Sequence, residues 1–132
     1  MGQDMSDWRT RHLMSEYEYP DLTPQQIAES ALRSYWGYLI SENLLTINPV
    51  NGDVLYCFMG LHHSVETLRD ALGSPTSLKL GEALKACLKA MLWNRENVKI
   101  SATTGQVRGG AKKDRSIVLA LQNALKTLET ST

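Results

Sequence analysis

The sequence of 132 residues predicts a single compact, mainly α-helical domain of about four helices with one or two small β-hairpins, at the margin of the α+β class. Apolar residues recur every three to four positions over long stretches, which is typical of helices that pack on a core. An Asn51-Gly52 pair lies between two β-prone runs and is typical of a hairpin turn. Apolar residues make up 42% of the chain and charged residues 21%, as in ordinary globular proteins.

A polar N-terminal arm over residues 1–20 precedes the predicted helical domain, which spans 21–130. The first helix is expected to begin after Thr23, because Thr23 and Gln26 match a capping box and Pro24 suits the first helical position. The first hairpin follows over residues 44–58.

A short helix is predicted next, over residues 64–73, with Ser64 as its N-cap and Gly73 at its end. Residues 77–94 have the apolar stripe of a longer helix. A second, weaker hairpin is expected over 97–108.

The last helix is predicted to run from about Asp114 to Leu128, with Asp114 or Ser116 as its cap. This completes the expected order of helix, hairpin, two helices, hairpin and helix.

Two cysteines are too few for a disulfide framework, and this favours a reducing, cytoplasmic compartment. No apolar run is long enough for a transmembrane helix, and the N-terminus lacks the apolar region of a signal peptide. We therefore expect a cytoplasmic protein, with association to a membrane surface as an alternative.

The net charge of zero conceals a strong asymmetry between the halves of the chain. Residues 1–70 carry ten acidic and four basic side chains, whereas residues 71–132 carry four acidic and ten basic ones. Such asymmetry indicates polyanion binding, or self-association in which one copy's acidic half meets another's basic half. The alternative is that the two halves neutralise each other within one fold.

A glycine-rich loop ahead of the last helix carries the densest group of cations. Backbone N–H groups at a helix start favour anions, and cations near them attract phosphate. A P-loop is excluded, because Ala111 rather than lysine follows Gly110. Lys85 and Lys89 share one helix face and extend the patch if the fold brings them close. The candidate residues for nucleic-acid or other polyanion binding are Arg108, Lys112, Lys113, Arg115, Lys85 and Lys89.

The alternative for this loop is a solvated basic segment kept mobile by Gly109 and Gly110. It contains no aromatic residue, so it offers no stacking platform for single-stranded bases.

Tyr35, Trp36 and Tyr38 gather three aromatic rings on the first helix. Their spacing does not allow all three to face one core, so one face is a candidate protein-binding surface. A wide core stripe in a small domain is the alternative interpretation.

The N-terminal residues Met1-Gly2-Gln3-Asp4-Met5-Ser6 match the N-myristoylation pattern, with Gly2 as the acceptor. Tyr19–Leu22, YPDL, resembles the YPxL late-domain peptide of viral matrix and Gag proteins; it also suits a turn before the first helix. Together with a small basic helical domain, these motifs resemble a retroviral-type matrix protein, although the basic cluster usual near the N-terminus of such proteins is absent. The resemblance implies a peripheral membrane protein whose basic patch meets acidic lipids.

Signals for catalysis are weak. His62 and His63 are adjacent and have no carboxylate or cysteine at metal-ligand spacing. Cys57 and Cys87 lie in apolar runs, where inert thiols are usual. We predict no enzyme, catalytic residue, metal or cofactor.

These observations favour a small non-enzymatic binding or assembly protein of viral or phage type, which contacts nucleic-acid phosphate through its basic C-terminal half and self-associates by charge complementarity. The alternatives are an N-myristoylated peripheral membrane matrix protein and a protein-binding cytoplasmic adaptor.

Overall fold

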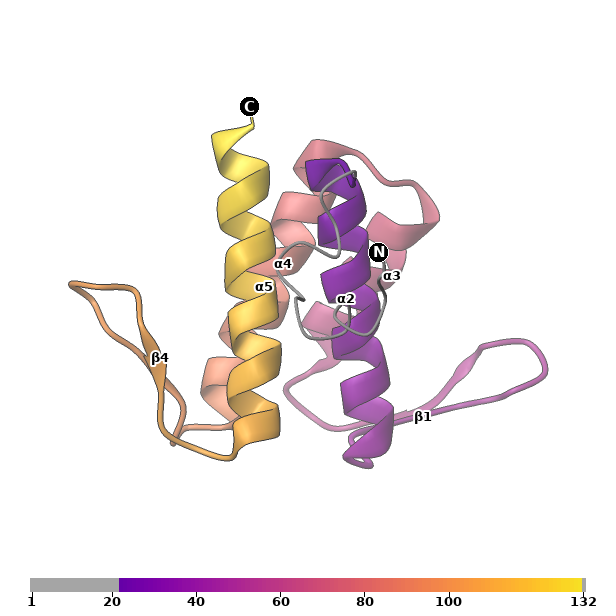
Figure 1. Ribbon diagram of the computed structural model, residues 1–132. Helices are drawn as coiled ribbons and strands as arrows, with labels where there is room; N and C mark the ends of the chain where they lie inside the picture. Colours follow the sequence, from indigo (N-terminus) through magenta and orange to yellow (C-terminus); the bar gives the residue numbers. More distant parts are fainter. Residues whose placement is uncertain (1–21, 132) are drawn as a thin grey trace, which may run out of the picture.

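The computed structural model describes residues 22–131 and confirms the predicted fold class (Figure 1). Within this part of the chain, four α-helices form a bundle and two antiparallel two-stranded sheets extend from one end of it. The elements are α2 (Pro24–Ser41), β1 (Leu45–Ile47), β2 (Val54–Cys57), α3 (His62–Gly73), α4 (Ser77–Asn94), β3 (Lys99–Ile100), β4 (Val107–Arg108) and α5 (Lys112–Thr130). The predicted arm over residues 1–20 lies outside the described residues.

Helix α2 begins where its capping residues predict. The Thr23 hydroxyl accepts a hydrogen bond from the Gln26 backbone N–H at 3.1 Å, and the Gln26 side chain accepts one from the Thr23 N–H at 2.9 Å. This reciprocal pair satisfies two of the N–H groups that a helix start leaves without partners.

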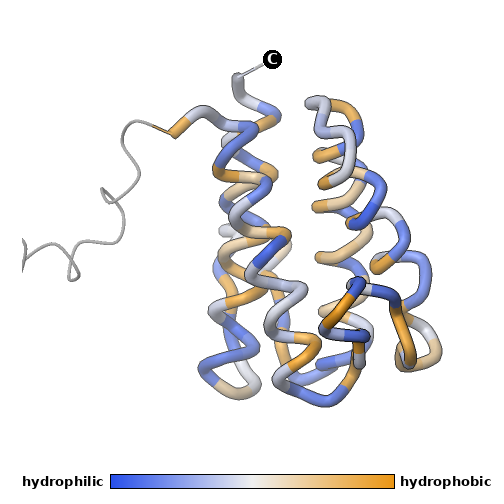
Figure 2. The backbone as a smooth tube through the Cα atoms, turned by 90° about the vertical axis from the view of Figure 1, so that its right-hand side faces the viewer, coloured by the Kyte–Doolittle hydropathy of each residue, from blue (hydrophilic) through white to orange (hydrophobic). Residues whose placement is uncertain are grey.

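Helix α4 is the centre of the bundle, because it packs against α2, α3 and α5. Hydrophobic and hydrophilic residues alternate along the helices, as the hydropathy colours of Figure 2 show. The buried hydrophobic residues come from all four helices and form one core cluster. The largest fully buried side chains are Tyr35, Leu32, Leu39, Leu45, Leu61, Leu68, Leu80, Leu84, Met91, Leu121, Val98 and Val118.

Both predicted hairpins are present. Strands β1 and β2 are antiparallel, with Leu45 opposite Cys57. Residues 48–53 connect them, and Gly52 in this connection has a φ of 77°. Strands β3 and β4 pair Lys99 with Arg108 and Ile100 with Val107. The hairpins project from the same end of the bundle on opposite sides, as Figure 1 shows.

Ser64 does not cap α3, contrary to the prediction. Helix α3 begins at His62, and Ser64 is a buried residue within it. Its hydroxyl donates to the carbonyl of Leu61 and lies 3.1 Å from the hydroxyl of Tyr35. The Ser64 side chain therefore contacts Tyr35 of α2 and does not cap the helix.

The predicted caps of the last helix are also wrong. Helix α5 begins at Lys112, after Ala111 in the N-cap position, and Asp114 is buried in its first turn. The hydroxyl of Ser116 donates to the carbonyl of Lys112 within the helix. The Asp114 side chain instead contacts Tyr38 of α2 and Arg95 at the end of α4.

No helix in residues 22–131 is long and apolar enough to cross a membrane.

Candidate polyanion interface

The turn between β4 and α5 is fixed by close packing of its two glycines. Gly109 and Gly110 have φ angles of 83° and 68°, which glycine adopts without strain. A Cβ atom on Gly109 would overlap the carbonyl oxygen of Asn97, and one on Gly110 would lie 2.5 Å from Cγ2 of Val98. The glycine pair is therefore explained by turn geometry and packing, without invoking mobility.

Two of the four cations in this segment are engaged in contacts within the fold. Lys113 Nζ lies 2.7 Å from Oε2 of Glu42 at the end of α2. Arg115 Nη1 donates to the carbonyls of Gly109 and Gly110, at 3.1 and 2.5 Å, and so holds the turn against its own helix.

The other two cations, Arg108 and Lys112, are exposed, and neither forms an ion pair within residues 22–131. These are cations that an external anion can reach.

A partly buried polar cluster joins the ends of three helices near this turn. The hydroxyl of Tyr38 donates to Oδ1 of Asp114 at 2.5 Å and accepts from Nε of Arg95 at 3.0 Å. Arg95 also lies 3.5 Å from Oδ2 of Asp114 and donates to Oε1 of Glu42 at 3.2 Å. The cluster fixes the start of α5 against α2 and the C-terminal end of α4.

Asp114 places a carboxylate of the chain itself in the first turn of α5, where the helix dipole favours negative charge. The helix start was predicted to attract an external anion. Of the cations that face solvent on α5, Lys112 lies at that start and Lys126 lies farther along the outer surface of the helix.

A groove of about 440 Å³ runs between the β3–β4 hairpin and this outer surface. Its described lining includes three cations, Lys112, Arg115 and Lys126, and no carboxylate. Gln122 Nε2 donates to the carbonyl of Gly105 at 3.0 Å, which ties the hairpin to the helix. The lining residues are Gly105, Gln106, Val107, Lys112, Arg115, Ser116, Leu119, Gln122, Asn123 and Lys126. We call this the α5 groove.

Lys126 lines this groove and was not among the predicted cations. It lies 14 residues after Lys112, and a helix places residues at that spacing on the same face. Apolar spacing indicates the buried face of this helix, whereas its opposite polar face carries no local motif that marks Lys126 as part of a site.

Lys85 and Lys89 do not extend the α5 groove. Both are exposed on α4 and line a separate groove of about 500 Å³ beside α3, together with His63 and Trp93. Of the six predicted cations, two line the α5 groove, two line the groove beside α3, and Lys113 pairs with Glu42. Arg108 is exposed and is not among the described lining residues of either groove.

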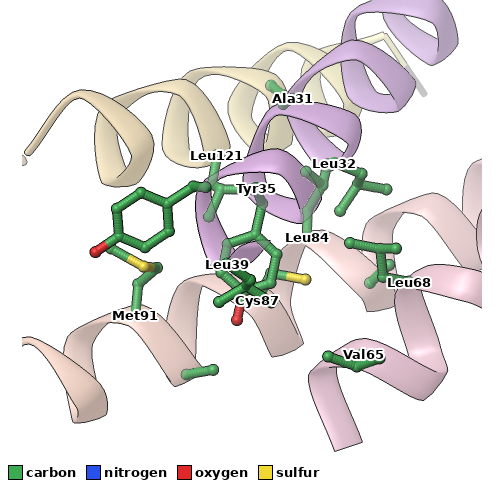
Figure 3. Close-up of a cluster of buried hydrophobic side chains, with 14 of the residues drawn as sticks. Ala31, Leu32, Tyr35, Leu39, Val65, Leu68, Leu84, Cys87, Met91 and Leu121 are labelled. Carbon is green, nitrogen blue, oxygen red and sulfur yellow. The ribbon is translucent and has the colours of Figure 1, made fainter. Parts of the chain in front are cut away.

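The prediction of a partner-binding aromatic surface is wrong for Tyr35 and Tyr38, because both are buried. Figure 3 shows Tyr35 among Leu39, Leu84 and Cys87 in the core, where burial raises the pKa of its hydroxyl. Trp36 is half-buried, and the guanidinium of Arg69 lies 6.0 Å from its ring centroid. The core-stripe interpretation holds for the two tyrosines, and only Trp36 retains contact with solvent.

The remaining candidates add no chemistry to this site. Burial raises the pKa of the Cys57 and Cys87 thiols and keeps them protonated. Among the described residues, no group of three or more His, Cys, Asp or Glu side chains is placed to hold a metal ion. Gly2, the predicted lipidation site, lies outside the described residues, as does most of the YPDL peptide.

Comparisons with protein-family models, with curated proteins and with solved structures find no match for this chain.

Proposed function

We propose that this protein binds nucleic acid through phosphate contacts in the α5 groove. The observation that carries the proposal is the set of three cations, with amide and hydroxyl side chains between them and no carboxylate among the described lining residues. Lysine and arginine that neutralise phosphates release counterions, which drives association.

The length of the cationic face favours a polyanion over a single phosphate. Lys112 and Lys126 are 14 residues apart, which corresponds to about 21 Å along a helix. Duplex DNA carries one charge per about 1.7 Å of its axis, so an extended nucleic acid presents several phosphates over this span.

Self-association by charge complementarity and a viral or phage origin stay predictions. Part of the complementarity between the two halves is used within one chain, where Glu42 pairs with Lys113 and Arg95. Lys79 and Asp70 form a further pair at 3.5 Å. The internal pairs reduce the charge that is left for a head-to-tail assembly.

Fluorescence anisotropy with labelled oligonucleotides across a salt series tests the proposal. The double variant Lys112→Ala/Lys126→Ala should bind more weakly, and the slope of log K against log salt should fall by about two, one unit per lost contact. Lys79→Ala is the control, because it removes a half-exposed lysine of α4 that lies outside the groove and pairs with Asp70. An unchanged slope in the double variant contradicts the proposal.

Vesicles containing acidic lipid distinguish the matrix-protein alternative. If the wild-type chain binds these vesicles with the same dependence on Lys112 and Lys126 but does not bind oligonucleotides at low salt, the ligand of the α5 groove is a lipid surface and the proposal fails.

A further inference from the structure

The groove between α3 and α4 combines cations with an exposed aromatic ring. Lys85, Lys89 and Trp93 are spaced four residues apart and form a row on one face of α4, with a rise of about 6 Å between neighbours. The side chain of Trp93 is 56% exposed, although tryptophan is usually well buried.

Trp93 is held in place from one side. Gly60 has a φ of 98°, and a Cβ atom on it would lie 2.5 Å from Cη2 of the indole, so the ring packs directly on glycine backbone. The ring of Phe58 lies 6.4 Å from that of Trp93, centroid to centroid, at an angle of 44°. The exposed indole is thus oriented before any ligand arrives, which lowers the entropic cost of stacking on it.

A row of two cations and one fixed aromatic ring matches the chemistry of single-stranded nucleic acid. Unpaired bases offer their faces to aromatic side chains, and the backbone between them offers phosphates to lysine. The bases of a duplex are stacked on each other and do not offer their faces. Lysine is depleted in protein–protein interfaces, so a groove with Lys85 and Lys89 on its wall fits a peptide less well.

Glu82 is the one carboxylate in the described lining of this groove, to which α3 contributes His63 and Ser64. Glu82 precedes Lys85 on α4, at the end of the row away from Trp93. The negative charge of Glu82 disfavours phosphate at that end of the groove. A single-stranded nucleic acid should therefore lie along Lys85, Lys89 and Trp93.

We propose that the α3–α4 groove binds single-stranded nucleic acid, with an unpaired base stacked on Trp93 and neighbouring phosphates at Lys89 and Lys85. This inference rests on the proposed function only in taking nucleic acid as the ligand, because it uses residues outside the α5 groove.

Affinities for an oligothymidylate and for a duplex of equal length, measured at one low salt concentration, test this site. Trp93→Ala should weaken single-strand binding by about fivefold to about 150-fold, as expected for one lost stacking contact, and leave duplex binding unchanged. Trp93→Phe should retain much of the affinity. Leu78→Ala is the matched control, because Leu78 is an exposed apolar side chain of the same helix (76%) outside this groove.

A second readout does not depend on an alanine variant folding correctly. The indole N–H signals of the tryptophans can be followed by NMR and the Trp93 signal assigned through Trp93→Phe. Oligothymidylate should shift this signal, whereas an abasic oligomer of equal length should not. Lys89→Ala should weaken single-strand binding without changing the denaturation midpoint, because Lys89 is exposed.

The outcomes separate the two sites. If Lys112→Ala/Lys126→Ala weakens binding but the Trp93 signal does not respond to oligothymidylate, the α5 groove stands and this inference fails. If Trp93→Ala weakens single-strand binding and the α5 double variant does not, the α3–α4 groove stands and the proposed α5 groove fails. A change in oligomeric state in Trp93→Ala, with single-strand affinity unchanged, would overturn the inference in favour of a protein-binding surface.

Discussion

The two buried tyrosines of α2 show how neighbouring residues of one type take different roles. Tyr35 shares a hydrogen bond with the neutral hydroxyl of Ser64, whereas Tyr38 donates to the carboxylate of Asp114 and accepts from Arg95. Burial raises the pKa of Tyr38, and the hydrogen bond to Asp114 raises it further, so the hydroxyl stays protonated as a donor.

Removing each hydroxyl therefore has a different expected cost. Tyr35→Phe should lower the free energy of unfolding by about 0.5–1.5 kcal/mol, as for a neutral hydrogen bond. Tyr38→Phe should lower it by about 1.5–3 kcal/mol, because a buried carboxylate and a guanidinium both lose a partner. Urea denaturation of the two variants measures both values, and equal costs would contradict a charge-assisted cluster at Tyr38.

Glu42 gives the fold a dependence on acid pH. The hydrogen bond from Lys113, aided by Arg95, holds the pKa of Glu42 below its ordinary value of 4.5. A carboxyl group whose pKa is lowered by folding stabilises the fold above that ordinary value, and the contribution is lost as the pH falls through the folded-state pKa.

Glu42→Gln should consequently be less stable than the wild type at pH 7, and the difference should narrow as the pH falls below about 4.5. Urea midpoints at several pH values measure this difference. In a Lys113→Ala background the effect of Glu42→Gln should be smaller, because the largest cause of the shift is gone. A difference that stays constant down to pH 3 is the contrary result.

At the scale of elements, the turn before α5 and the turn of the first hairpin both use glycine with positive φ, but only one of them is crowded. Gly109 meets the carbonyl of Asn97, whereas a Cβ atom on Gly52 meets nothing within 4 Å. Gly52→Ala should cost about 1–2 kcal/mol of stability from backbone strain alone. Gly109→Ala should cost about 1–3 kcal/mol more, from overpacking. Thermal or urea denaturation of the two variants measures both losses of stability. Similar losses would mean that the Asn97 backbone shifts easily to make room for the added Cβ atom.

Sequence patterns predicted those elements whose signals are local. The capping box at Thr23 and Gln26 gave α2 its correct start, and periodicity alone placed α4 within its observed bounds. Ser64 and Asp114 misled the prediction of helix starts, because both are cap-forming residue types that here serve contacts with Tyr35 and Tyr38. Partners 29 and 76 residues away in the chain cannot be read from a local pattern.

The same limit applies to the candidate sites. The cations of the loop before α5 were identified by composition, but the internal pair of Lys113 with Glu42 joins residues 71 apart. The Lys85, Lys89 and Trp93 row was present in the sequence at four-residue spacing. Its significance depends on Gly60 and Phe58, which fix the ring from another element.

At the scale of the whole molecule, the neutral net charge coexists with local basic surfaces. Residues 22–131 carry twelve basic and nine acidic side chains. The Glu42–Lys113 and Glu42–Arg95 pairs join the two oppositely charged halves at one end of the bundle. Among residues 22–131, no such pair engages the three cations of the α5 groove, and this separation leaves part of the basic surplus available to a polyanion.

The arrangement of the helices also predicts where the molecule opens most easily. Helix α4 packs against three helices, whereas α3 packs mainly against α4 and is the shortest of the four described helices. Elements with fewer buried contacts open at lower free energy, so backbone amides of α3 should exchange hydrogen faster than those of α4. Native-state hydrogen exchange followed by NMR measures this order. Single-stranded nucleic acid in the α3–α4 groove would contact both helices. Saturating oligothymidylate should therefore slow hydrogen exchange in α3 of the wild type, and it should slow exchange much less in Trp93→Ala. Protection of α3 equal to that of α4 before ligand is added would instead show that the bundle opens only as one cooperative unit.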